Sequence, residues 1–384
     1  MKIVNKAHRY RFYPTEEQKM QLSNAFGCSR FVYNHFLKER TDAYYEKKEK
    51  INYHKTSALL TELKNSENCC WLRDVSSVTL QQSLRDLDKA FTNFFSGRAR
   101  YPKFKKKNSK QSIRYVKTGF TFSNGILKIA KNKEPLNIRW SRHFSCEPTS
   151  ITVSKDCYNR YFVSFAVEES VCNLPKVDNK IGIDVGIKDV CVTSECFRSG
   201  SPKYSKKYEE KLTKLQRSLS KKVKGSKNRI KAKLKVAKVH AKISDSRNDF
   251  NNKLTTKLIN ENQVIAVESL NVKGLMRNQI LAKSISDSSW GDILLKLKYK
   301  AEWYGRELIE IDRWFPSSKR CSCCGYINNG LKLSDRLWTC PSCESTLDRD
   351  VNAAKNILTV GQAGLAFGES GRLGNNKLLQ SVSL

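Results

Sequence analysis

Four cysteines towards the carboxyl end of the chain have the spacing of a metal site. Cys321 and Cys324 form one C-x2-C pair, and Cys340 and Cys343 form a second pair after fifteen intervening residues. Each pair can make a tight turn whose two thiolates face one ion, which predicts a closed, structural site for one Zn²⁺. A pairing of Cys321 with Cys323 is an alternative that would give a poorer knuckle. Disulfides or free thiols are a further alternative, and a reducing compartment disfavours the disulfides.

Three acidic residues lie within or beside apolar segments, where burying an acid without a partner costs free energy. Asp184 lies in an otherwise apolar run, Glu268 ends another apolar run, and Asp350 directly precedes a segment with helical periodicity. Burying even a neutral polar group without a partner costs about 2–7 kcal/mol, and a divalent cation offsets that cost. Taken singly, each acid has an ordinary explanation: a backbone hydrogen bond for Asp184, a lysine partner for Glu268 and a helix N-cap for Asp350.

The order of the three acids is more informative than any one of them. An acid in a strand, an acid at a strand end and an acid at a helix start make up the ribonuclease-H-like arrangement. Such carboxylates hold two Mg²⁺ or Mn²⁺ ions about 4 Å apart, because these cations prefer oxygen ligands. Asp348 competes for the third position, and Asp350 is preferred because it adjoins the helical segment.

The elements that position these residues are predicted from hydrophobic periodicity. Runs at 181–185 and 264–270 predict strands, and the segment after Asp350 predicts a helix. We therefore expect an α/β nuclease domain over residues 179–360 with a zinc-binding insertion at 316–346. The Gly-, Asn- and Ser-rich residues 361–384 predict a flexible tail.

The amino-terminal part of the chain has a different pattern. Residues 1–14 alternate like a strand, and Thr15 and Gln18 have the spacing of a capping box at the start of a helical region, residues 15–97. A β-hairpin is predicted around residues 151–167.

Two segments carry nearly all of their charge with one sign. Residues 98–142 hold fourteen Lys or Arg and one acid, and residues 203–242, which predict a helical hairpin, hold sixteen against two Glu. A solvated helix pair would mix both signs, so a role in binding phosphates is favoured. Tyr101 and Phe104 could stack on bases, although burial is the interpretation we prefer. The candidate nucleic-acid contacts are Lys103, Lys105, Lys106, Lys107, Lys221, Lys222, Lys224 and Arg229.

Composition supports a polyanionic partner. The 71 Lys and Arg against 37 Asp and Glu give a formal net charge of +34, which destabilises a compact chain unless a polyanion binds its surface. A membrane surface is the weaker alternative. Neither a long apolar stretch nor a signal segment is evident, so we expect the protein to stay in the compartment where it is made. We expect a cytoplasmic, nucleoid-associated protein in a prokaryotic host.

In sequence the chain resembles the TnpB (OrfB) family of transposon-encoded proteins, which are related to type V CRISPR effectors. The resemblance runs in order through the motifs HRYRFYPT (8–15), YPKFK (101–105), GIDVG (182–186), VESL (267–270), WFPSSKRC (314–321) and DRDVNAAKN (348–356). It covers nearly the whole chain to about Val360.

The resemblance implies an RNA-guided DNA endonuclease. Its partners would be a guide RNA and double-stranded target DNA, and its single RuvC-like site would be formed by Asp184, Glu268 and Asp350. It further implies the four-cysteine zinc site and an amino-terminal β-barrel, residues 1–14 and 98–178, interrupted by a helical recognition domain at 15–97. Either a monomer or a dimer is compatible with the sequence.

Two other functions remain open at this point. A nuclease-inactive, guided DNA-binding repressor would be expected to lack one carboxylate, and all three are present. A strand-transfer transposase could use the same fold and metals.

Overall fold

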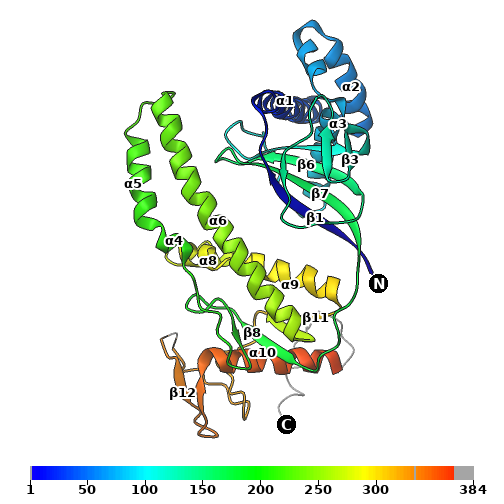
Figure 1. Ribbon diagram of the computed structural model, residues 1–384. Helices are drawn as coiled ribbons and strands as arrows, with labels where there is room; N and C mark the ends of the chain where they lie inside the picture. Colours follow the sequence, from blue (N-terminus) through cyan, green and yellow to red (C-terminus); the bar gives the residue numbers. More distant parts are fainter. Residues whose placement is uncertain (1, 333, 367–384) are drawn as a thin grey trace. The chain divides into compact units, whose positions relative to one another are not determined.

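The computed structural model describes residues 2–332 and 334–366. The chain divides into two compact units: an N-terminal unit, residues 3–170, and a C-terminal unit that contains the described chain from Val171 onward. Figure 1 shows the elements of both units. Within the described ranges, none of the helices has both the length and the apolar composition that crossing a membrane requires.

The helices of the N-terminal unit follow the predicted pattern. They are α1 (Glu16–Lys47), α2 (Tyr53–Asn65), a 3-10 helix (Glu67–Asp74) and α3 (Ser77–Phe95). The predicted capping box is present: the Thr15 hydroxyl accepts from the Gln18 amide at 3.3 Å, and the Gln18 side chain accepts from the Thr15 amide at 3.1 Å. These bonds satisfy two of the amide donors that a helix start leaves without partners.

The N-terminal unit also contains a five-stranded sheet of order β2-β6-β7-β1-β5. Its strands are β1 (Lys2–Phe12), β2 (Gln111–Val116), β5 (Ile138–Arg139), β6 (Pro148–Lys155) and β7 (Tyr161–Val171). A separate hairpin joins β3 (Phe120–Ser123) and β4 (Ile126–Ile129). The β6–β7 hairpin confirms the predicted one. The order leaves β2 and β5 as edge strands, so barrel closure stays a prediction.

The C-terminal unit is built on a four-stranded mixed sheet of order β11-β10-β8-β9. Strands β8 (Lys180–Asp184), β10 (Val264–Glu268) and β11 (Glu307–Ile311) are parallel, and β9 (Val192–Thr193) runs antiparallel to β8. Parallel strands are usually covered on both faces, which explains the continuous apolar runs around Ile183 and Ile265.

Helices connect the parallel strands. Between β8 and β10 lie α4 (Tyr204–Lys207), α5 (Glu209–Ser220) and α6 (Lys227–Glu261). Between β10 and β11 lie α7 (Val272–Leu275), α8 (Ala282–Ser288) and α9 (Trp290–Tyr304). The predicted helical hairpin is α5 and α6, seen in Figure 1 as two antiparallel green helices, and α6 extends well beyond the predicted end of the hairpin at residue 242.

The last described helix, α10 (Arg349–Ala366), packs directly on this sheet. A Cβ atom added to Gly182 would lie 1.9 Å from the backbone oxygen of Ala354, and one added to Gly361 would lie 2.8 Å from Ala266. Glycine at position 182 therefore permits the close approach of helix and strand. Residues 361–366 belong to α10, so the predicted flexible tail does not begin at residue 361. The remainder of that tail lies outside the described residues.

A small two-stranded sheet precedes α10. Strands β12 (Leu337–Thr339) and β13 (Thr346–Asp348) pair antiparallel. They form the part of the chain that holds the second cysteine pair.

Candidate active site

Two of the three predicted carboxylates end neighbouring parallel strands. Asp184 is the last residue of β8, and Glu268 is the last residue of β10. Since Val267 is level with Ile183 across the two strands, the acids that follow them reach the same edge of the sheet. Carboxyl ends of parallel strands are where open α/β sheets form their sites.

The third carboxylate lies in the first turn of α10, the helix that packs on β8. The sequence pattern predicts Asp350 directly before the helix. In the structure Asp350 is the second residue of the helix. The capping role belongs to Asp348, whose carboxylate accepts from the amides of Asp350 at 3.1 Å and Val351 at 3.0 Å. The structure therefore gives the two competing acids different local roles: Asp348 caps the helix through its Oδ1 atom, and Asp350 lies within the first turn.

The three predicted carboxylates interact electrostatically. Burial, followed by the charges of Glu268 and Asp350, raises the pKa of Asp184 to about 8. Burial also raises the pKa of Glu268, although the Ser317 hydroxyl, which donates to Glu268 Oε1 at 2.5 Å, lowers it in part. Buried like charges of this kind favour protonation or a bound cation.

Two arginines partly neutralise the third carboxylate. The Arg198 guanidinium lies 2.8 Å from Asp348, 3.1 Å from Asp189 and 3.7 Å from Asp350. Arg336 lies 3.4 Å from Asp350. Neither arginine was identified from the sequence, because nothing in its spacing relates it to an acid; only the fold brings each one to this site.

The donor set fits a hard divalent cation. Asp184, Glu268 and Asp350 offer only carboxylate oxygens, which suit Mg²⁺ or Mn²⁺ and not zinc. A cation among them would replace the proton that Asp184 otherwise holds near neutral pH.

The four predicted zinc ligands converge more closely. Cys321 and Cys343 lie 3.6 Å apart between their sulfurs, Cys324 and Cys340 lie 3.5 Å apart, and all four sulfurs lie within 4.8 Å of one another. Tetrahedral zinc with Zn–S bonds near 2.3 Å requires sulfurs roughly 3.8 Å apart. Among residues 2–332 and 334–366, these cysteines are the group of potential metal ligands that is drawn together this tightly.

Two matching knuckles present the cysteines. The Gly325 amide donates to the backbone carbonyl of Cys321 at 3.0 Å, and the Glu344 amide donates to the backbone carbonyl of Cys340 at 2.9 Å. Both turn residues have positive φ, +80° for Gly325 and +59° for Glu344. The exposed Cys323 is not part of the sulfur cluster, so its alternative pairing with Cys321 is not the one adopted.

Two asparagines attach the first knuckle to the helix that carries Asp350. The Asn352 carboxamide accepts from the Ser322 amide at 2.8 Å, and the Asn352 and Asn356 side chains donate to the Arg320 carbonyl at 2.7 and 2.6 Å. Asn356 also donates to the Ser317 carbonyl at 2.8 Å. Both asparagines are buried in an otherwise apolar helix face. Their i, i+4 spacing was a signal that the sequence analysis missed.

The predicted nucleic-acid contacts occupy two separate places. Lys221, Lys222 and Lys224 are exposed at the turn between α5 and α6. Arg229 also has a structural task, because its guanidinium donates to the carbonyls of Leu219 at 3.0 Å and Lys222 at 2.7 Å. Lys103, Lys105, Lys106 and Lys107 lie in an exposed segment of the N-terminal unit.

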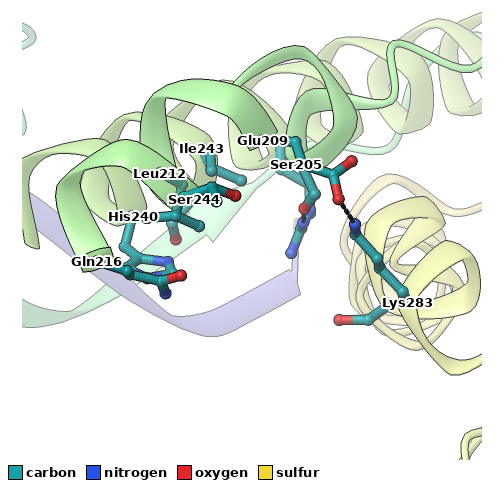
Figure 2. Close-up of a pocket in the computed structure, with 11 residues that line it drawn as sticks. Ser205, Glu209, Leu212, Gln216, His240, Ile243, Ser244 and Lys283 are labelled. Atoms are coloured by element: carbon teal, nitrogen blue, oxygen red, sulfur yellow. Dashed lines mark hydrogen bonds and ion pairs between the residues drawn. The ribbon is translucent and has the colours of Figure 1, made fainter. Parts of the chain in front are cut away.

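A cavity of about 510 Å³ lies at the base of the helical hairpin, between α5, α6 and α8. Figure 2 shows His240 and Gln216 at one end of it and the ion pair between Glu209 and Lys283 at the other. Both signs of charge line this cavity. The base of the hairpin therefore differs from its turn, where the lysines lie.

Comparisons with known proteins cover most of the chain. Family models described as "Probable transposase", "Cas12f1-like, TNB domain" and "Helix-turn-helix domain" match residues 163–279, 290–357 and 1–49. A Streptomyces pristinaespiralis protein named "Putative RNA-guided DNA endonuclease" is 47% identical over 99% of this chain and 97% of its own length. The Escherichia coli K12 protein of the same description, InsQ, is 30% identical over 94% of each.

A solved structure shares the fold. It is described as "Cryo-EM structure of the Cas12f1-sgRNA-target DNA complex", with a TM-score of 0.57 and 14% identity. The match covers 92% of this chain and 98% of the solved one.

Proposed function

This chain belongs to the TnpB (OrfB) family, and from that premise we propose that it is an RNA-guided DNA endonuclease. Its substrate would be double-stranded DNA selected by base pairing with a guide RNA, and the solved complex whose fold it shares contains an sgRNA and target DNA. The reaction would be hydrolysis of a phosphodiester bond at one site in the C-terminal unit.

The observation that carries this proposal is the sheet edge that Asp184 and Glu268 share, together with the effect of the Asp350 charge on the pKa of Asp184. Asp184 and Glu268 end adjacent parallel strands, and Asp350 approaches them on a helix seated against Gly182. The raised pKa of Asp184, caused by burial and by both other acids, supports a cation-binding role for the three together.

In this mechanism the protein supplies position and charge. Two bound Mg²⁺ ions would activate a water molecule and stabilise the leaving oxygen. Asp184 and Glu268 would hold them at the sheet edge, and the hydroxyl of Ser317 would orient the Glu268 carboxylate. Asp350 would complete the set after exchanging its arginine partners for the metal. Zinc at the four cysteines would brace α10 through Asn352 and Asn356.

The remaining parts would hold nucleic acid. We propose that the sheet of the N-terminal unit closes into a barrel that acts with α1–α3 in recognition, and that residues 179–360 form the RuvC-like domain with its zinc insertion at 316–346. The lysine-rich turn at 221–224 would contact phosphates. Either a monomer or a dimer is compatible with this arrangement.

A plasmid assay tests the proposal. The purified chain with co-expressed RNA and Mg²⁺ should cut supercoiled DNA only where the guide matches. Binding without cutting would favour the repressor, and joined donor ends would favour the transposase. Asp184→Ala should reduce cutting to background while RNA affinity stays within about twofold, because the residue contacts the metal and not the guide. Cutting at the wild-type rate by this variant would refute the site.

A further inference from the structure

A second cavity, of about 380 Å³, lies in the N-terminal unit. Its lining includes lysine and arginine side chains and contains no aspartate or glutamate. It is formed by α1 and by the segment 103–112, which leads into β2. Its five cationic residues are Arg30, Lys103, Lys105, Lys106 and Lys110. Like charges gathered around one hollow repel one another, so the arrangement favours an anionic occupant.

Uncharged side chains hold this hollow in shape. Asn34 of α1 bonds the backbone of Lys105 twice, donating to its carbonyl at 3.0 Å and accepting from its amide at 2.8 Å. Gln111 donates to the carbonyls of Lys106, Lys107 and Ser109 at 3.1, 3.1 and 2.7 Å. Its Oε1 accepts from Arg30 at 2.9 Å. The loop and one of the cations are therefore fixed in advance, which lowers the entropic cost of binding.

One buried group that lines the cavity lacks a partner. The Ser29 side chain is only 5% exposed, and its hydroxyl oxygen makes no hydrogen bond in the described part of the chain. An unpaired buried hydroxyl costs about 1–3 kcal/mol. This unpaired donor lies beneath the cations of the cavity and is itself closed off from solvent.

An aromatic ring lies at the same cavity. Phe104 lines it and is 57% exposed, so the preferred sequence interpretation, burial of this ring, is wrong. An exposed phenylalanine beside lysines is the combination with which proteins bind unpaired nucleotides, because the ring stacks on a base while the cations hold the phosphate.

We propose that this cavity binds one nucleotide of a single-stranded polynucleotide. Its phosphate lies among Arg30, Lys103 and Lys106, and its base stacks on Phe104. A paired base inside a duplex stays stacked on its neighbours, so the occupant is an unpaired residue. The presence of a polynucleotide rests on the proposed function. The guide RNA and a displaced DNA strand are its two sources.

Photo-crosslinking in the full chain with guide and target tests this assignment. A benzoylphenylalanine at position 104 should crosslink to nucleic acid at least fivefold more than one at Phe95, an aromatic of the same unit that is 77% exposed. Loss of the crosslinked band with ribonuclease identifies the guide as the source, and loss with deoxyribonuclease identifies DNA. A chain that forms its complex but crosslinks equally at both positions overturns the cavity assignment alone. A chain that binds no polynucleotide removes the proposed function as well.

Charge removal gives an independent measurement. Lys103→Gln with Lys106→Gln should weaken binding of a single strand about tenfold at low salt and lower the salt-dependence slope by roughly 1.4, since each lost contact contributes about 0.7. Lys128→Gln with Lys133→Gln removes the same charge from exposed positions outside the cavity and should change the slope by less than half as much. If the two double variants lowered the salt-dependence slope by the same amount, the proposal would be contradicted.

Discussion

The cysteine cluster and the carboxylate cluster are two ligand sets built in opposite ways. The cysteines come from two short knuckles that fold locally and are alike in hydrogen bonding, and their sulfurs are already at the spacing that zinc requires. The carboxylates come from three segments more than eighty residues apart. They are brought to one part of the C-terminal unit only by strand pairing and helix packing, and the charges of Glu268 and Asp350 contribute to the raised pKa of Asp184.

The difference teaches how a proposed structural site and a proposed catalytic site would use metal affinity differently. With four protein ligands the cysteine site is closed, so zinc bound there would contribute its binding energy to folding. The carboxylate site keeps an unfavourable charge cluster, which is the local instability expected at a functional centre. The asparagines of α10 join the two sites, so damage to the cysteine site should reach the carboxylates.

Removal of a zinc ligand should have the largest effect on the fold. Cys340→Ser leaves three thiolates, so the protein should lose its equivalent of zinc and several kcal/mol of unfolding free energy. Metal analysis together with thermal unfolding measures both. Cys323→Ser is the matched control, because Cys323 is exposed and outside the sulfur cluster. An unchanged zinc content in the Cys340 variant would refute the site.

Removal of the central acid should stabilise the metal-free protein. The pKa of Asp184 is about 8 in the fold and near 4 in an unfolded chain. The folded state therefore keeps a proton that the unfolded chain releases between these values, and stability falls as the pH rises from about 4 to 8. In EDTA, Asp184→Asn should raise the unfolding free energy at pH 8 by up to a few kcal/mol and change it little at pH 4.

The control for this experiment is an exposed acid. Asp249→Asn removes a carboxylate that is 61% exposed and paired with Lys253, so its effect should be small at either pH. Added Mg²⁺ should stabilise the parent protein and not the Asp184 variant. A variant that is less stable than its parent at pH 8 in EDTA would contradict the charge-cluster explanation.

The close packing of α10 against β8 can be tested by adding one methyl group at Gly182. Gly182→Ala places a Cβ where Ala354 oxygen lies 1.9 Å away, so the helix must move. We expect a loss of about 1–3 kcal/mol, the usual effect of overpacking, and a larger loss in cutting, because α10 carries Asp350. Gly291→Ala is the control, since nothing lies within 4 Å of the added atom. Normal cutting by the Gly182 variant would show that Asp350 does not depend on this contact.

The same contrast explains what the sequence could predict. The cysteine spacing, the apolar strands around Asp184 and Glu268, and the capping box at Thr15 are local patterns, and the structure contains each of these elements. Arg198, Arg336 and Ser317 reach the acids by tertiary folding alone, so no local pattern marks them. Arg229 was assigned to phosphates because of its charge, and its bonds to the carbonyls at the end of α5 are a further contact that no local pattern marks.

The smallest predicted effect concerns the second knuckle. Glu344 adopts φ +59° at the position where the first knuckle has Gly325, and a left-handed conformation costs a non-glycine residue roughly 1–2 kcal/mol. Glu344→Gly should therefore stabilise the zinc-loaded protein by up to about 1 kcal/mol, after allowing for the extra flexibility of glycine in the unfolded chain. Denaturant unfolding at fixed zinc measures this. Gly325→Ala, which imposes the same strain on the first knuckle, should destabilise by a similar amount. If neither Glu344→Gly nor Gly325→Ala changed the free energy of unfolding, the positive φ at Glu344 would not be a source of strain in the second knuckle.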